Sequence, residues 1–334
     1  MTGIDDSEGM ALAIAAADAP HPSVSPNPRV GCAIVTIEGV IHTGATEPPP
    51  GRHAERVALD AAGEDARGAT AFVTLEPCGH HGRTPPCADA LIDSGVDRVV
   101  VAIEDPDPLV AGEGVELLRE AGVSVDVGER TDEVEAQLAA YLTHRRTGRP
   151  YVTLKLAATL DGRTAAPDRT SQWITGEAAR ADAHRLRAAS DAILVGAGTV
   201  RADDPSLTVR HVDGTDPLRV VLGQAPSQAR VHPCREMSGE LPEILDELGA
   251  DEVVRLLVEG GATVAADFHR AGLVDRYVVY LAPALMGGDD APGLFAGPAV
   301  TTIGDVWRGR ITDVVRLGDD LRIDLLPNHE PGDH

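Results

Sequence analysis

His53-Ala54-Glu55 begins a metal-binding pattern that continues with Glu76-Pro77-Cys78 and ends at Cys87. One imidazole and two thiolates supply three protein ligands, which leaves the fourth position of a tetrahedral zinc site for water, as catalytic zinc requires. Zinc lowers the pKa of its bound water toward ~7, so hydroxide is available at neutral pH. His53 and Glu55 are two residues apart and therefore do not share one ladder of a helix. We expect His53, Cys78 and Cys87 to hold the metal and Glu55 to carry protons.

A structural zinc site is the alternative interpretation, because such sites usually close with a fourth protein ligand. Candidates for that ligand are His80, His81 and Cys32. The catalytic interpretation is favoured by position, since Cys87 stands at the start of a predicted helix over residues 88–94. A thiolate is stabilised there by the partial positive charge of the helix N-terminus. We expect Cys32 to be a small core residue behind the site.

The composition excludes several classes of protein. The chain has 334 residues and a net charge of -24, and it lacks the basic stripe that binding to nucleic acid needs. No apolar run approaches the 18 residues of a membrane span, and no signal peptide is recognisable. We therefore expect a cytoplasmic protein with a small-molecule substrate. In a reducing setting, cysteines spaced with nearby histidine indicate metal rather than disulfides.

Strand and helix patterns alternate along the whole chain, which indicates an α/β protein. Predicted strands over 30–36 and 40–43 form a hairpin, and a predicted polar helix over 131–146 is followed by chain-breaking Gly148 and Pro150. We place the domain boundary there. The sequence thus predicts two α/β domains, residues 1–147 and 148–330.

The first domain resembles a known family in two places. The eight-residue insert between Cys78 and Cys87, together with Pro26–Cys32, is similar to the pyrimidine deaminase of riboflavin biosynthesis, a branch of the cytidine-deaminase-like superfamily. The resemblance implies a three-layer fold, Zn²⁺ and a diamino-hydroxy-ribosylamino-pyrimidine 5′-phosphate as substrate. It places Asn27 beside the base and Arg52 where the family usually has proline, a change that bears on substrate grip. Further contacts to base, ribose or phosphate, each with a capping or solvated loop residue as the alternative, are implied for His80, His81 and Arg83.

The second domain lacks a GxGxxG fingerprint, so a Rossmann site is disfavoured. Over residues 151–282 an ordered series of motifs instead resembles the reductase domain of the same pathway, which has a dihydrofolate-reductase-like fold and uses NADPH. The substrate contacts that the resemblance implies are Ser171, Arg187, Leu207, Arg210 and Glu259. The NADPH contacts that it implies are Ala157, Trp173, Thr199, Asp203, Gly261, Ala262, Thr263, Val264, Ala265, Ala266 and Asp267.

Three features of this domain have a physical rationale. Gly260-Gly261 follows a predicted strand and opens a predicted helix, where backbone N–H groups can bind phosphate. Arg187 and Arg210 are candidate phosphate clamps because a guanidinium binds phosphate bidentately. Lys155 is the only lysine in the chain, and we hypothesise that its ammonium orients the sugar C1 region and assists proton transfer as a catalytic group. A solvated lysine at a strand end is the alternative.

Two departures from the family leave alternatives open. The stretch between Leu222 and Val253 is short, so a strand and its loop are expected to be missing. Gly223-Gln224 replaces a small hydroxyl residue near the expected adenosine 2′-phosphate, which leaves preference for NADPH over NADH undecided.

The favoured function is a bifunctional deaminase and reductase. The alternatives are a deaminase with a reductase-inactive nucleotide-binding domain, a nucleobase or tRNA deaminase, and a regulatory protein with structural zinc. The acidity and the eight-residue insert disfavour nucleobase or tRNA deamination, and the three-ligand site with Glu55 disfavours a regulatory role. No motif specifies the oligomeric state, so a homo-oligomer stays open.

Overall fold

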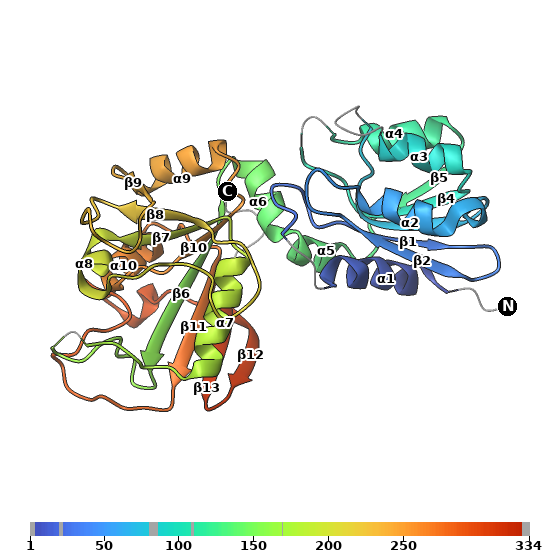
Figure 1. Cartoon of the computed structure of the whole chain (residues 1–334). Helices are drawn as coiled ribbons and strands as arrows, with labels where there is room; N and C mark the ends of the chain where they lie inside the picture. Colours follow the sequence, from blue (N-terminus) through green and yellow to red (C-terminus); the bar gives the residue numbers. More distant parts are fainter. Residues whose placement is uncertain (1–3, 20–22, 80–85, 108–109, 169, 329–334) are drawn as a thin grey trace. The chain divides into compact units, whose positions relative to one another are not determined.

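The structure is a computed structural model that describes residues 4–19, 23–79, 86–107, 110–168 and 170–328. The chain divides into two compact units, Met1–Gly148 and Arg149–His334 (Figure 1). Each unit has its own sheet, and apolar side chains pack against that sheet within the same unit. The division lies one residue beyond the boundary drawn from the sequence.

The first unit contains a five-stranded sheet in the order β2-β1-β3-β4-β5. Strand β1 pairs antiparallel with both neighbours, which confirms the predicted hairpin, and β3, β4 and β5 are parallel. The strands are β1 (Gly31–Val35), β2 (Ile41–Ala45), β3 (Thr70–Leu75), β4 (Arg98–Ile103) and β5 (Ser124–Val127). The helices are α1 (Asp6–Asp18), α2 (Ala54–Ala62), the short 3-10 helix η1 (Gly63–Ala66), α3 (Cys87–Ser94), α4 (Glu113–Glu120), α5 (Thr131–Gln137) and α6 (Ala139–Thr147).

Helices cover both faces of this sheet, which makes the three layers that the fold class requires. In Figure 1, α1 and α5 lie against one face, and α2, α3 and α4 lie against the other. Helix α1 begins at a capping box, in which Asp5 accepts the N–H of Glu8 and Glu8 accepts that of Asp5. It packs so closely on β1 that a Cβ at Gly31 would lie 1.9 Å from the carbonyl oxygen of Ala13. The single helix predicted over 131–146 is wrong, because the backbone leaves helical geometry at Leu138.

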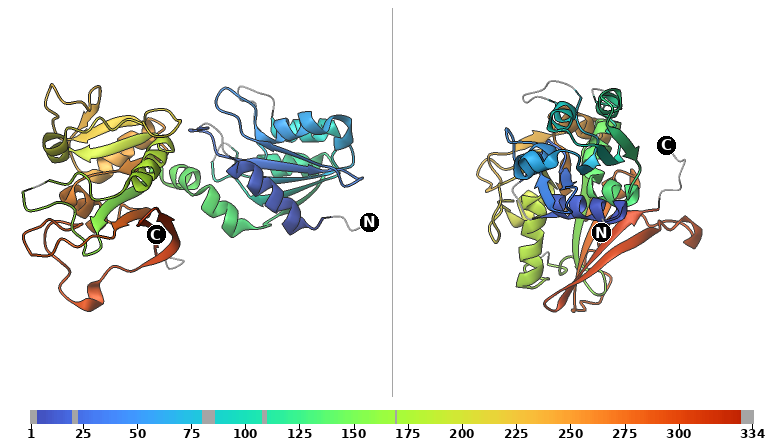
Figure 2. Two further views of the ribbon diagram at one scale, coloured as in Figure 1. Left: turned by 60° about the horizontal axis from the view of Figure 1, so that its bottom comes forward. Right: turned by 90° about the vertical axis from the view of Figure 1, so that its right-hand side faces the viewer.

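The second unit contains an eight-stranded sheet in the order β12-β13-β11-β6-β10-β7-β8-β9. The six strands from β11 to β9 are parallel, and β12 and β13 form an antiparallel hairpin at one edge, red in Figure 2. The strands are β6 (Tyr151–Thr159), β7 (Ala192–Gly196), β8 (Leu218–Leu222), β9 (Arg235–Met237), β10 (Arg255–Val258), β11 (Arg276–Ala282), β12 (Gly309–Leu317) and β13 (Asp320–Pro327). The helices are α7 (Glu177–Ala188), α8 (Ala197–Asp203), α9 (Leu241–Ala250), α10 (Ala262–Arg270) and the short 3-10 helix η2 (Ile303–Asp305).

Alternate side chains of the central strands feed two cores. Leu154 of β6 and Leu256 of β10 pack with α9 and α10 on one face, whereas Ile193 of β7 and Leu257 of β10 pack on the other face with α7 and α8. This alternation follows from the period-2 geometry of a strand. Strand β9 lies within the stretch where a strand was expected to be missing. This strand is short, and it pairs in parallel with β8.

Candidate zinc centre and reductase site

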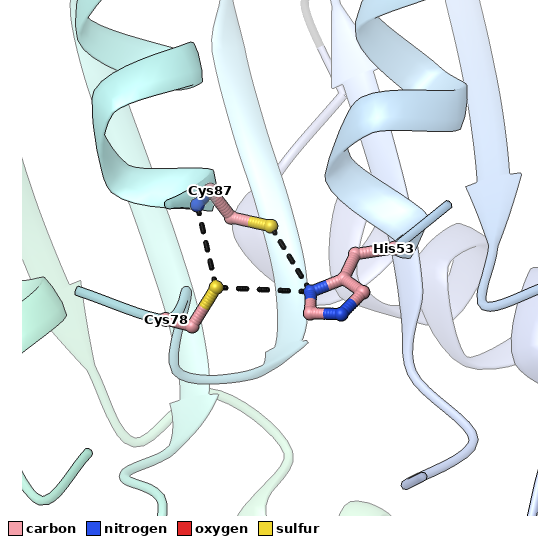
Figure 3. A group of neighbouring side chains, drawn as sticks. All are labelled: His53, Cys78 and Cys87. Carbon is pink, nitrogen blue, oxygen red and sulfur yellow. Dashed lines mark hydrogen bonds between the residues drawn. The ribbon is translucent and has the colours of Figure 1, made fainter. Parts of the chain in front are cut away.

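Three predicted metal ligands converge at one end of the first sheet (Figure 3). His53 is the N-cap residue of α2, Cys78 follows β3, and Cys87 is the first residue of α3. The Nδ1 atom of His53 lies 3.3 Å from the Sγ of Cys87 and 3.7 Å from that of Cys78. All three donor atoms lie within 4.8 Å of one another. These residues are far apart in the sequence, and they meet because α2 and α3 begin, and β3 ends, at the same end of the sheet.

The donor set and its spacing fit a zinc ion. Tetrahedral bonds of about 2.3 Å to sulfur and about 2.0 Å to nitrogen put ligand atoms roughly 3.5 Å apart. Hydrogen bonds from the Cys87 side chain, the His53 ring and the Cys87 N–H lower the pKa of Cys78 to about 4. The same pairing with Cys78, together with burial, raises the pKa of Cys87. One of the two sulfurs is therefore held as the thiolate that a metal requires.

Glu55 lies buried beside this cluster, on the first turn of α2. Burial in apolar surroundings raises its pKa to about 7, and the nearby Cys78 adds to that shift. A carboxyl group that changes protonation near neutral pH is suited to carrying protons. Cys32 is also fully buried, and burial raises its thiol pKa well above the usual value. Among the described residues it does not join the three clustered donors.

Glu76, just before the ligand Cys78, has a role that the sequence did not reveal. Its buried carboxylate accepts four backbone N–H groups. Oε2 accepts those of Asp105 at 3.1 Å and Gly112 at 3.0 Å. Oε1 accepts those of Gly114 at 3.0 Å and Val115 at 3.2 Å. These bonds tie the loop before α4 and the start of α4 to the end of β3, where Cys78 lies. The Glu-Pro-Cys motif was the signal, although it did not identify the partners.

The loops before the ligands account for the remaining predictions in this unit. Asn27 is half-buried in a turn, where its N–H donates to the carbonyl of Val24 at 3.0 Å. Arg52 is exposed and pairs with Glu47 at 2.6 Å and with Asp60 at 2.8 Å. Its guanidinium is thus occupied by carboxylates of its own chain. The proposed contacts His80, His81 and Arg83 lie outside the described residues.

In the second unit, a largely buried ion cluster forms where β10 ends beside the middle of β6. Glu259 follows β10, and its carboxylate accepts the guanidinium of Arg187 from α7 through two bonds of 2.7 and 2.9 Å. Its Oε2 lies 3.8 Å from Nζ of Lys155 on β6. Arg187 and Lys155 together hold the pKa of Glu259 at about 2, despite a burial that acts in the opposite direction. Ligands bind at the carboxyl ends of the strands in open α/β sheets, which is where this cluster lies.

The segment around Leu207 flanks this cluster. Leu207 is buried and has a φ of 54°, a left-handed conformation that is unusual for leucine. The backbone N–H of Arg210 donates to Nδ1 of His184 at 3.2 Å, and burial, with the charge of Arg187, lowers the pKa of His184 to about 4. The guanidinium of Arg210 contacts the hydroxyl groups of Ser206 and Thr208.

The remaining predicted residues lie on the loops and helices that follow β6, β7 and β10. Trp173 is 69% exposed and stacks with Arg180, whose guanidinium carbon lies 4.7 Å from the ring centroid. Ser171, two residues earlier, is half-buried. Gly261 is the N-cap of α10, and its N–H donates to the Thr199 hydroxyl at 3.1 Å. Asp203 lies half-buried at the end of α8, where burial raises its pKa.

The remaining members of the proposed NADPH set differ in access. Ala157 on β6 is half-buried, as are Ala262 and Val264 on α10, whereas Thr263 is exposed. Ala265 and Ala266 point into the core, and Asp267 is exposed and paired with Arg270 at 2.8 Å. A cofactor could therefore reach the first turn of α10 but not the core side of that helix.

Helix α7, which carries Arg187 and His184, is held by the last strand. Asp320 of β13 accepts the N–H of Gly176, the N-cap of α7, at 2.6 Å. Arg322 of β13 reaches the buried Asp182 at 3.0 Å, and the same carboxylate accepts the hydroxyl of Tyr280 at 2.8 Å. The position of the half-buried Arg187 thus depends on contacts made near the end of the described chain.

Family models match both halves of the chain. Residues 4–103 match the cytidine and deoxycytidylate deaminase zinc-binding region, and residues 150–323 match the RibD C-terminal domain. The riboflavin biosynthesis protein RibD of Mycobacterium tuberculosis is 44% identical over 96% of this chain and 96% of its own length. That of Escherichia coli is 38% identical over 97% of this chain and 100% of its own length. The chain belongs to the RibD family.

Solved structures agree with this family assignment. Acinetobacter baumannii RibD superposes with a TM-score of 0.91 at 39% identity, covering 97% of this chain and 99% of that chain. A Thermotoga maritima diaminohydroxyphosphoribosylaminopyrimidine deaminase/5-amino-6-(5-phosphoribosylamino)uracil reductase superposes with a TM-score of 0.87 at 33% identity, covering 96% and 98%. The predicted pairing of a cytidine-deaminase-like domain with a RibD-type reductase domain is confirmed. Within the described residues, no helix has the length and apolar character needed to cross a bilayer.

Proposed function

We propose that this RibD-family deaminase and reductase acts on 2,5-diamino-6-ribosylamino-4(3H)-pyrimidinone 5′-phosphate. Its first unit would hydrolyse an amino group from the ring, and its second would reduce the ribosyl group to a ribityl chain with NADPH. The observation that carries the proposal is the convergence of His53, Cys78 and Cys87 beside the buried Glu55. The name of the Thermotoga maritima relative supports the choice of substrate.

In the first unit, His53, Cys78 and Cys87 would hold Zn²⁺. When bound, zinc supplies a Lewis acid that makes hydroxide available at neutral pH. The role of Glu55 is to accept a proton from the attacking water and to deliver one to the departing amine. Its raised pKa of about 7 suits both directions of transfer. Asn27, in the loop before β1, is proposed to contact the base.

In the second unit, Lys155 lies in the middle of β6 beside Glu259 at the end of β10, where we propose that the ribose binds. NADPH supplies the hydride when bound. Glu259 and Arg187 hold Lys155 in a fixed electrostatic setting, because the carboxylate lies between the two cations. Because the guanidinium of Arg187 is paired with Glu259 through two hydrogen bonds, we propose Arg210 as the residue that binds the phosphate directly. Ser171 and Leu207 would complete the substrate site. The N-terminal turn of α10, with Gly261 and Thr199, would receive the cofactor.

A deaminase with a reductase-inactive second domain is the second candidate. The short stretch between Leu222 and Val253, with Gly223-Gln224 in place of a hydroxyl residue, is the observation that favours it. Incubation of zinc-loaded protein with the pyrimidine phosphate, with and without NADPH, separates the two functions. Ammonia release with NADPH oxidation supports the bifunctional enzyme, and ammonia release without oxidation supports the second candidate.

Two variants test the residue roles. Glu55→Gln should keep its zinc and lose ammonia release by ~10²-fold or more, since general acid–base catalysis contributes at least that factor. Lys155→Arg keeps the charge but changes its shape, and should lose NADPH oxidation while ammonia release continues. Full ammonia release by Glu55→Gln would refute the first role, and unchanged NADPH oxidation by Lys155→Arg would refute the second.

A further inference from the structure

A second cluster of metal-binding side chains lies at the edge of the reductase sheet, on the segment that leads into β9. His232, Cys234 and Glu236 each place one donor atom within 4.8 Å of the others. His232 and Cys234 lie just before β9 and Glu236 lies within it, so one short segment supplies all three donors. Arg235, between two of them, pairs instead with Glu247 and with Asp251 at 2.5 Å. The neighbouring cation therefore does not fill the space between the three donors.

Backbone groups orient two of these donors. The Nε2 atom of His232 lies 3.0 Å from the carbonyl oxygen of Pro226, to which it can only donate, so Nδ1 keeps its lone pair. That Nδ1 atom lies 3.5 Å from the Sγ of Cys234. Oε1 of Glu236 accepts the N–H of Ala225 at 3.0 Å. Metal-binding histidines are typically fixed in this way, by a hydrogen bond from the other ring nitrogen.

The first cluster of the same chain provides an internal comparison. There the Nδ1 atom of His53 faces two sulfurs at 3.3 and 3.7 Å, and in the second cluster the Nδ1 atom of His232 faces Cys234 at 3.5 Å. The two clusters differ in their third donor and in burial. Glu236 replaces a thiol, and His232 and Glu236 are exposed. The second cluster is therefore suited to binding a cation rather than to catalysis.

We propose that His232, Cys234 and Glu236 form a second metal site that takes a borderline-soft divalent cation such as Zn²⁺. Nitrogen, sulfur and carboxylate oxygen are all ligands of zinc, and solvent would complete a four-coordinate ion. All three ligands come from five consecutive residues, so binding would stiffen the short edge strand β9 and the Ala225 turn attached to it. Because the site is exposed and has one thiolate where the buried cluster has two, we expect it to bind more weakly than the buried cluster.

The test is an equilibrium titration of the reduced, metal-free full chain with Co²⁺, whose thiolate complexes absorb in the near ultraviolet. The wild-type chain should saturate at two equivalents, and the second step should carry the absorbance of a single thiolate. Cys234→Ser and His232→Gln should each saturate at one equivalent. Glu243→Gln, which removes an exposed carboxylate on the neighbouring helix α9, serves as the matched control and should retain two.

Deaminase activity of the zinc-loaded variants separates this site from the first. Cys234→Ser should release ammonia at the wild-type rate, and wild-type fluorescence from the two tryptophans, both in the second unit, shows that this unit is folded. Cys78→Ser should keep the single-thiolate step and lose ammonia release. A wild-type chain that saturates at one equivalent overturns the proposal, as does a second step that survives in both Cys234→Ser and His232→Gln. Either result leaves the proposed deaminase function untouched.

Discussion

Replacing Glu76 by Gln tests the hydrogen bonding that organises the zinc centre. Each carboxylate oxygen accepts two backbone N–H groups, at distances from 3.0 to 3.2 Å. The amide of Gln keeps one oxygen and turns an NH₂ group toward the other pair, so two buried donors lose their acceptor. Each unsatisfied buried donor costs about 1–3 kcal/mol, which gives a loss of about 2–6 kcal/mol for the first unit.

Hydrogen–deuterium exchange of the full chain in increasing urea measures this loss within the first unit. With a urea dependence of about 2 kcal/mol per molar, the midpoint for its peptides should fall by about 1–3 M. The peptides that span residues 105–115 should exchange faster even without urea. Glu116→Gln, an exposed charge-matched change on α4, should shift the midpoint by less than about 0.3 M. A shift for Glu76→Gln as small as that of the control would refute the reasoning.

Three further predictions follow from other contacts. Arg52→Ala should leave the deaminase KM within about twofold and should change stability only slightly, because the ion pairs of Arg52 with Glu47 and Asp60 are exposed to solvent. A tenfold rise in KM would instead place Arg52 on the substrate. Arg187→Met should leave the carboxylate of Glu259 buried without its ion pair to Arg187, and should destabilise the second unit by about 3–5 kcal/mol. Urea unfolding followed by tryptophan fluorescence measures this loss, because both tryptophans lie in that unit, and a loss below about 1 kcal/mol would contradict this account. The pKa of His184 in the folded state is lowered to about 4, so the unfolded chain takes up a proton first as the pH falls, and the free energy of unfolding of the second unit should drop between about pH 6.5 and pH 4. His184→Gln should make this dependence of stability on pH weaker, and an unchanged dependence would exclude His184 as its source.

Regular patterns in the sequence predicted most of the fold. The predicted hairpin over 30–36 and 40–43 matches β1 and β2 to within two residues at each end, and the predicted helix over 88–94 matches α3 to within one. The hairpin of β12 and β13 was missed, since β12 is exposed along most of its length and has no alternation to detect. Helix α8 was missed because its seven residues are too few to show a helical period.

The candidate sites divide in the same way. The zinc ligands and Glu55 were predictable because a metal site needs particular side chains at particular spacings. The pairing of Arg187 with Glu259 was not, because 72 residues separate them and no local pattern encodes the contact. For the same reason, the sequence could not predict that four backbone N–H groups donate to Glu76, because the loop before α4 lies beside the end of β3 only in the folded chain.

The attachment of α7 to β13 has a consequence for synthesis of the chain. The first sheet is complete in sequence once β5 has been made, at Val127. Helix α7, in contrast, cannot form its contacts with β13 until Asp320 and Arg322 have been synthesised. We therefore expect deaminase structure to form on the ribosome well before the reductase becomes protease-resistant. Arrested nascent chains that stop before or after β13 would reveal this order, and early resistance of the reductase segment would contradict it.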